Sequence, residues 1–234
     1  MATSSNHQIL AETFDRWAAA GRAAEMEVEH GDVARQVIAG MGIRAGDQIL
    51  DLGCGNGWST RLLAKAAAGA QATGIDISPA MIAEAERLHS NTIRARYAVG
   101  AFEKLDLPDA RFQRGFSLEA LYYSPDPAAA LVEVLRVMKP GGTFDVVIEY
   151  YAENEGTAFW PEQTRVPMIR WSEAQWQAEF ERAGFVELAA RRVVDSRGLG
   201  EPERFKPSLC YPSWQTWSDV HSAGFLWLHA VKPR

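Results

Sequence analysis

A glycine-rich stretch, ILDLGCGNGWST at residues 49–60, contains the first residues whose types and spacing could do chemistry. Gly53, Gly55 and Gly57 lie within five residues, directly after an apolar run. Glycine loses more conformational freedom on folding than any other residue, so its repeated use here needs a compensating reason. A ligand that must come closer to the backbone than a Cβ permits is such a reason. The stretch therefore predicts a ligand cradle.

A carboxylate accompanies this cradle at the end of the next apolar run. Asp76 lies 19 residues after Gly57, and a carboxylate at that point can accept hydrogen bonds from both hydroxyls of a ribose. The helix that follows the glycines favours a negative group, such as a carboxylate, at its N-terminus. We therefore expect an adenosine-type ligand.

The spacing of the glycines bears on which ligand of this type is bound. The chain has G-x-G-x-G, whereas the dinucleotide fingerprint is G-x-G-x-x-G, and no phosphate-gripping G-K-[ST] is present. This weakens the competing interpretation of a nicotinamide-dependent dehydrogenase.

Short apolar runs alternate with helical segments over the first two thirds of the chain. This rhythm predicts βαβ units, in which a parallel sheet is covered by helices on both faces. Ser78 with Pro79, and Asp126 with Pro127, are favoured helix starts. The predicted strands are residues 46–53, 71–78, 93–101, 111–121 and 143–151, and the predicted helices are 58–68, 80–90 and 127–138.

The two ends of the chain depart from this rhythm. Helical composition marks residues 7–25 and 31–41, and a helix is expected from Ser172 to Gly184, followed by two closing strands, 185–194 and 224–232, around a long loop. We expect a doubly wound α/β fold with a mostly parallel seven-stranded sheet whose final strand is antiparallel. The predicted organisation is one domain over residues 1–234, with a helical cap at 1–42 and substrate-side insertions at 151–171 and 196–220.

Composition and charge limit the classes of partner. The 234 residues carry a formal net charge of −6, and without a Lys/Arg-rich run a nucleic-acid partner is not expected. No apolar run approaches the roughly 20 residues that span a bilayer, so membrane insertion is not expected. Cys54 and Cys210 lie in no metal-ligand spacing, so no metal is expected. With no secretory signal pattern at the N-terminus, the predicted location is the cytoplasm.

Five motifs occur in this order along the chain: ILDLGCGNG, GIDISPAMI, GAFEKLDLP, FSLEALYYSPDP and MKPGGTF. Together they resemble the class I S-adenosylmethionine-dependent methyltransferases, which have a Rossmann-like fold. The resemblance spans residues 45–150 and is closest to the small-molecule branch that includes the ubiquinone and menaquinone methyltransferases. The resemblance implies S-adenosyl-L-methionine as the cofactor and a small-molecule acceptor, predicted here to be aromatic or apolar.

The resemblance also implies roles for individual residues. Asp51 and the glycine loop would hold the methionine part, Asp76 the ribose, and Ile77 the adenine. Ala101 stands where the family usually has an aspartate for the adenine amino group. This leaves backbone contacts at Ala101 and Phe102, and the side-chain hydrogen bond is absent unless Glu103 makes it. An aromatic residue of the N-terminal helix, Phe14 or Trp17, would cover the cofactor. The predicted cofactor-binding residues are Trp17, Asp51, Gly53, Cys54, Gly55, Asp76, Ile77, Met81, Ala101, Phe102, Glu103 and Leu118.

Methyl transfer from a sulfonium is an in-line substitution governed by positioning and desolvation, so it demands few catalytic groups. A general base helps where the acceptor carries a proton. The predicted catalytic residues are Glu119, Tyr122 and His30, with Glu149 and Tyr151 as further candidate bases at a strand end. A non-enzymatic alternative is a cofactor-binding module that acts as a partner or sensor. The acceptor atom and the oligomeric state are left open.

Overall fold

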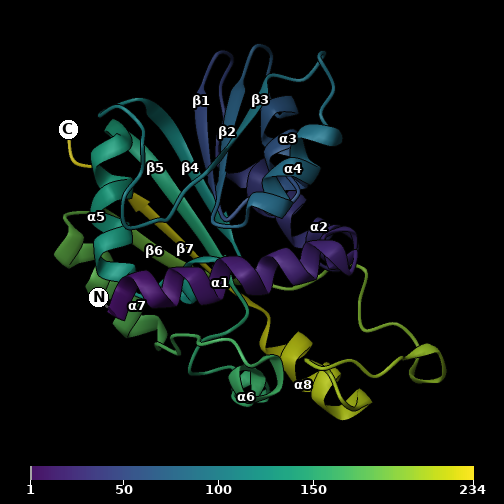
Figure 1. Ribbon diagram of the computed structural model, residues 1–234. Coiled ribbons are helices and arrows are strands. Elements are labelled where there is room, and N and C mark those ends of the chain that lie inside the picture. Colours follow the sequence, from purple (N-terminus) through teal and green to yellow (C-terminus); the bar gives the residue numbers. More distant parts are fainter. Residues whose placement is uncertain (1) are drawn as a thin grey trace.

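The computed structural model describes residues 2–234 and shows one central sheet with helices packed on both of its faces (Figure 1). The sheet has seven strands in the order β3-β2-β1-β4-β5-β7-β6. The first five strands are parallel, whereas β7 runs antiparallel to both β5 and β6. The predicted fold class is thus confirmed. The strands are β1 Gln48–Leu52, β2 Gln71–Asp76, β3 Ala95–Val99, β4 Phe112–Leu118, β5 Met138–Ile148, β6 Val186–Val193 and β7 Phe225–Val231.

Two buried clusters, one on each face, hold the helices to the sheet. Side chains alternate between the faces of a strand, so Val147 of β5 packs in the cluster that includes α2 and α3, while Val146 and Ile148 pack in the cluster that includes α5 and α7. Across residues 2–234, every helix is too short or too polar to cross a membrane. The helices are α1 Ala2–Ala19, α2 Arg22–Gly40, α3 Trp58–Lys65, α4 Pro79–Arg87, α5 Pro127–Val137, α6 Trp160–Thr164, α7 Glu173–Ala183 and α8 Trp214–Ala223.

Side-chain caps start several helices where the sequence predicts them. The Ser78 hydroxyl accepts the Met81 backbone N–H at 3.0 Å at the start of α4. Asp126 accepts the Ala129 N–H at 3.0 Å at the start of α5. Each cap satisfies an N–H that has no partner within the helix, so local sequence fixes where these helices begin after their strands.

Three expected boundaries are wrong. The segment 7–25 is two helices, because Gly21 adopts φ 76° and breaks the helix between α1 and α2. The expected long loop before the last strand contains α8, which is capped by Ser213. Met138 begins β5, where it pairs with Phe112, instead of ending the preceding helix.

Helix α1 lies across the end of the sheet at which the parallel strands finish, and it packs against α2 and α4 (Figure 1). Asp15 on α1 accepts the Ala80 backbone N–H at 3.0 Å, which ties α1 to the start of α4. The N-terminal helices are therefore placed over the carboxyl ends of the strands, where ligands bind in such sheets.

Candidate active site

A cavity of about 200 Å³ lies at the carboxyl ends of the parallel strands and is covered by α1 and α2. Most of the site residues predicted from the sequence lie in its wall, whereas Asp51 and the further candidate bases Glu149 and Tyr151 do not. The predicted residues that line it are Trp17, His30, Gly53, Cys54, Gly55, Asp76, Ile77, Met81, Ala101, Phe102, Glu103, Leu118, Glu119 and Tyr122.

The three glycines of the loop after β1 all have positive φ, but the surroundings of their Cα atoms differ. A Cβ on Gly53 would collide with Ala120, and one on Gly57 would collide with the ring of Tyr97. A Cβ on Gly55, which has φ 51°, would meet no protein atom within 4 Å. Gly53 and Gly57 are thus required by packing, whereas Gly55 faces the open cavity and leaves its backbone accessible to a ligand.

Asp51 lies behind this loop instead of in the cavity wall. Its carboxylate accepts the hydroxyls of Ser59 at 2.7 Å and Thr60 at 2.6 Å, both in the first turn of α3. Burial raises the pKa of Asp51 to about 6, and these two hydrogen bonds oppose the rise. In this structure Asp51 anchors α3 to the end of β1 and so supports the loop from beneath; direct contact with a cofactor stays a prediction.

Asp76 occupies the position predicted for ribose binding, at the end of β2. Its carboxylate accepts the backbone N–H of Gly55 at 2.8 Å and that of Ser78 at 2.9 Å. Burial raises the pKa of Asp76, against the effect of these hydrogen bonds. A carboxylate has about four acceptor sites, so two hydroxyls of a ligand in the cavity can still donate to it.

The far end of the cavity is closed by contacts between α1 and the loop after β3. The Glu103 carboxylate contacts His7 Nε2 at 2.9 Å and accepts the Ser124 hydroxyl. Phe14 of α1 packs edge-to-face on Tyr123, with the ring centroids 5.1 Å apart. Glu103 therefore already has His7 and Ser124 as partners, and its hydrogen bond to an adenine stays a prediction.

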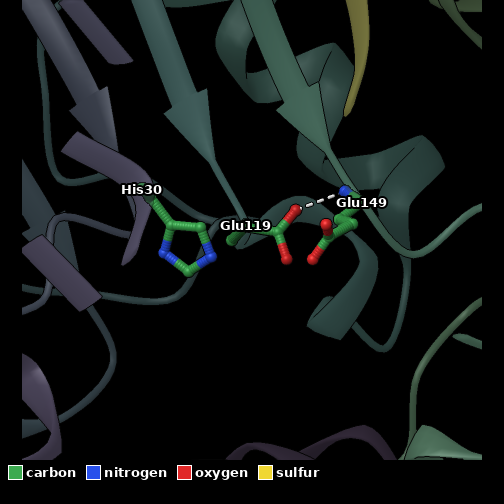
Figure 2. Close-up of side chains that lie close together, drawn as sticks. All are labelled: His30, Glu119 and Glu149. Carbon is green, nitrogen blue, oxygen red and sulfur yellow. Dashed lines mark hydrogen bonds between the residues drawn. The ribbon is translucent and has the colours of Figure 1, made fainter. Parts of the chain in front are cut away.

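A polar cluster lies where β4 and β5 end, and it joins three separate elements (Figure 2). Glu119 follows β4 with φ 52°, a conformation that non-glycine residues seldom adopt. Glu119 accepts the Tyr122 hydroxyl at 2.7 Å and the backbone N–H of Glu149. Glu149 follows β5 and accepts the Tyr211 hydroxyl at 2.7 Å. With His30 of α2, the two carboxylates place one nitrogen or oxygen each within 4.8 Å of one another.

Burial controls the protonation of this cluster. Desolvation raises the pKa of Glu119 to about 7, and desolvation together with the nearby charge of Glu119 raises the pKa of Glu149 to about 8. Desolvation lowers the pKa of His30 to about 4. At neutral pH the imidazole is therefore neutral, and the carboxyl groups titrate in the range useful for proton transfer.

Cys54 can be set aside as a nucleophile. Its thiol is buried, and desolvation with the charges of Asp76 and Asp51 raises its pKa well above the ordinary value. A thiol held neutral in this way is a poor nucleophile. Cys54 is a small loop residue that lies against Gly74.

The remaining wall of the cavity is aromatic and apolar, and most of it was not predicted residue by residue. The ring of Trp160 stacks on that of Tyr150, with the centroids 6.0 Å apart, and its N–H donates to the Cys210 carbonyl at 3.0 Å. Tyr211, the partner of Glu149, comes from the C-terminal insertion, whose fold the sequence does not indicate. Tyr151, a candidate base, instead donates its hydroxyl to the carbonyls of residues 223 and 224.

Comparisons with known proteins agree with this geometry. Residues 50–146 match the methyltransferase domain family Methyltransf_11. The 2-methyl-6-phytyl-1,4-hydroquinone methyltransferase of Synechocystis sp. is 32% identical over 194 residues, which are 81% of this chain and 56% of that protein. An O-methyltransferase of Aspergillus sclerotiorum is 32% identical, over 73% of this chain and 67% of its own length. The chain thus spans about half to two thirds of the length of these curated relatives.

A solved structure resembles the chain over nearly its whole length. In the complex of the Haloferax volcanii Trm112 methyltransferase activator with a candidate methyltransferase, the matching chain is 32% identical, with a TM-score of 0.85, and the match covers 94% of this chain and 98% of that one. The fold is the doubly wound α/β fold, with a cavity at the carboxyl ends of its parallel strands. The chain belongs to the family of S-adenosylmethionine-dependent methyltransferases.

The cofactor of this family is S-adenosyl-L-methionine, and the residues present fit it. Gly55 leaves open space above its backbone, as a close ligand requires. Asp76 lines the same cavity with acceptor capacity to spare for a ribose. Ile77, Met81 and Phe102 line the cavity with apolar side chains, against which an adenine could pack.

Proposed function

We propose that the protein transfers the methyl group of S-adenosylmethionine to a small acceptor that is aromatic or apolar. The observation that supports this most directly is that the cavity lined by Gly55 and Asp76 is also lined by members of the polar cluster and by aromatic side chains. These are His30, Glu119, Tyr122, Tyr211 and Trp160. Cofactor and acceptor would meet within this cavity. Similarity to a hydroquinone methyltransferase favours a ring compound that carries a hydroxyl group.

The residues of the cluster would handle the acceptor's proton. When bound, S-adenosylmethionine supplies a methyl group that is already activated on a sulfonium. Glu119 would accept the proton that the acceptor releases, since burial places its pKa near neutral pH. Tyr122 would hold the Glu119 carboxylate in place through its hydroxyl. His30 would present a neutral imidazole that does not compete for the proton.

Three segments would exclude water from this reaction, namely the cap at 1–42 and the insertions at 151–171 and 196–220. In support, Phe14 comes from the first segment, Trp160 from the second and Tyr211 from the third, and all line the cavity. Removal of water strengthens the electrostatic interactions within a site and suppresses side reactions.

The non-enzymatic alternative, a binding module that has lost catalysis, has less support. The glycine loop, Asp76 and a polar cluster at the strand ends are all in place. A dehydrogenase is disfavoured by the glycine spacing. The cytoplasmic location and the absence of a nucleic-acid partner stay predictions from the sequence.

Methyl transfer from isotope-labelled S-adenosylmethionine to a panel of hydroquinones, phenols, amines and thiols tests the proposal. We expect label in a hydroquinone or phenol, and a loss of about 10²-fold or more in Glu119→Gln, in the range of general-base catalysis. Tyr151→Phe is the matched control, because its buried hydroxyl donates to backbone carbonyls instead of to the cluster. Cofactor binding without transfer to any acceptor class would favour the binding module.

We also propose that an activator protein pairs with this chain. The support is the likeness to the chain solved with the Trm112 activator, which extends over 98% of that chain. Purified Haloferax volcanii Trm112 should co-elute with this protein in size-exclusion chromatography and raise its transfer rate. Separate elution with no change in rate would refute the pairing.

A further inference from the structure

The cluster at the ends of β4 and β5 has the composition and size of a metal site. His30 comes from α2, Glu119 from the end of β4 and Glu149 from the end of β5, and one donor atom of each lies within 4.8 Å of the others. A point central to three such atoms is a little under 3 Å from each, so a small contraction reaches the roughly 2.0–2.2 Å of Zn²⁺ bonds to nitrogen and carboxylate oxygen.

The imidazole of His30 gives an independent indication. The residue is only 7% exposed, and Figure 2 shows one ring nitrogen directed toward Glu119 and the other directed away. No hydrogen bond between residues that the structure describes engages the nitrogen facing Glu119. A neutral imidazole with a free ring nitrogen is the commonest metal ligand among side chains.

Each of the two carboxylates is held by hydrogen bonds. Tyr122 and the backbone N–H of Glu149 hold Glu119, and Tyr211 holds Glu149. Partners of this kind fix the orientation of ligating carboxylates. Two ionised carboxylates buried side by side repel each other and need a shared cation or proton between them.

We propose that His30, Glu119 and Glu149 bind a divalent transition-metal ion of the Zn²⁺ or Mn²⁺ kind. One imidazole with two carboxylates is a mixed nitrogen and oxygen donor set, which suits such ions better than Mg²⁺ or Ca²⁺. Three protein ligands leave a coordination position open toward the cavity, where a hydroxyl group of an acceptor can bind and lose its proton more readily.

This inference departs from the sequence-based expectation that no metal is bound. The three ligands lie far apart in the sequence, at positions 30, 119 and 149, and so leave no spacing motif. The inference goes beyond the proposed function, in which Glu119 serves as a proton acceptor without an ion. Its test reads metal binding directly and is separate from methyl transfer.

The test is titration calorimetry of the full chain, stripped with a chelator, against ZnCl₂ and MnCl₂, with elemental analysis of the dialysed protein. We expect one equivalent of bound metal, and a loss of about tenfold or more in affinity for His30→Ala and for Glu149→Gln, since even weaker perturbations around a metal cost 10–100-fold. The matched control is His229→Ala, which removes a histidine that contacts Asp145 at 2.8 Å outside the cavity. It should bind metal as the wild type does.

Binding of S-adenosylhomocysteine by each variant serves as the check that it is folded. Wild-type protein that binds the nucleoside but takes up no metal would overturn the proposal and assign a shared proton to the two carboxyl groups. Metal binding that His30→Ala and Glu149→Gln leave unchanged would also overturn it, because the ion would then lie elsewhere. Neither result would bear on methyl transfer, which the labelled-cofactor assay decides.

Discussion

Replacing Asp76 by alanine should change two quantities, the stability of the protein and its affinity for the cofactor. The carboxylate accepts the N–H groups of Gly55 and Ser78 at 2.8 and 2.9 Å. Ser78 is fully buried, so its orphaned N–H should lower the free energy of unfolding by about 1–3 kcal/mol. The Gly55 N–H faces the cavity, where water can replace the carboxylate.

The loss of ligand affinity follows from the same reasoning. A ribose that no longer donates to Asp76 loses about 1–3 kcal/mol of binding free energy, which is about 5- to 150-fold in Kd. Titration calorimetry with S-adenosylhomocysteine measures this, and Asp76→Asn, which keeps one acceptor oxygen, should fall between wild type and alanine. Chemical denaturation of the same samples measures the change in the free energy of unfolding separately.

A buried aspartate outside the cavity provides the control. Asp145 accepts the ring N–H of Trp227 and contacts His229, both at 2.8 Å. Asp145→Asn should lower stability but leave the Kd for S-adenosylhomocysteine within about twofold of wild type, well under 1 kcal/mol. If Asp76→Ala also kept a wild-type Kd while folded, the assignment of the ribose to this carboxylate would be refuted.

Three further outcomes follow from the site. Gly55→Val should fold but lose nucleoside binding by calorimetry, because its side chain enters the open cavity, whereas Gly200→Val, at a similarly open position, should bind normally; equal affinity in both would contradict the cradle. The pKa of Glu149 is raised from 4.5 to about 8, so the folded state holds the proton more tightly and stability falls as pH rises through this window. In urea denaturation, the free energy of unfolding of Glu149→Gln should therefore rise relative to that of wild type as the pH rises. A difference that does not change with pH would contradict the raised pKa. His7→Ala removes the contact of α1 with Glu103, worth about 0.2–1 kcal/mol, so hydrogen exchange in α1 should speed up; unchanged exchange would mean that this contact does not hold the lid.

The parallel half of the fold was predictable because its signals are local. Apolar runs, glycine stops and the caps at Ser78 and Asp126 act within a few residues of their own position, and the structure has them where expected. The sequence does not predict the break between α1 and α2 at Gly21, because the residues on both sides of Gly21 have helical composition. Only the left-handed backbone conformation of this glycine shows where the first helix ends.

The sequence predicted most of the residues that line the cavity near the glycine loop and Asp76, but only part of its aromatic wall. Which part the cofactor occupies stays a prediction. Residues at strand ends, such as Asp76 and Glu119, are placed by topology once the strand order is known. Tyr211 could not be placed, because an irregular insertion of the chain carries it to Glu149 and no periodic pattern marks that path. The neutral state of His30 likewise depends on burial by neighbours from other elements.

The direction in which the cofactor lies within the cavity is the central claim, and a crystal structure with S-adenosylhomocysteine tests it most directly. We expect ribose hydroxyls on Asp76, the amino-acid part along the loop at Gly55, and the sulfur directed toward Glu119. A nucleoside bound in the reverse direction, or outside this cavity, would contradict the account and would separate Glu119 from the transferred methyl group.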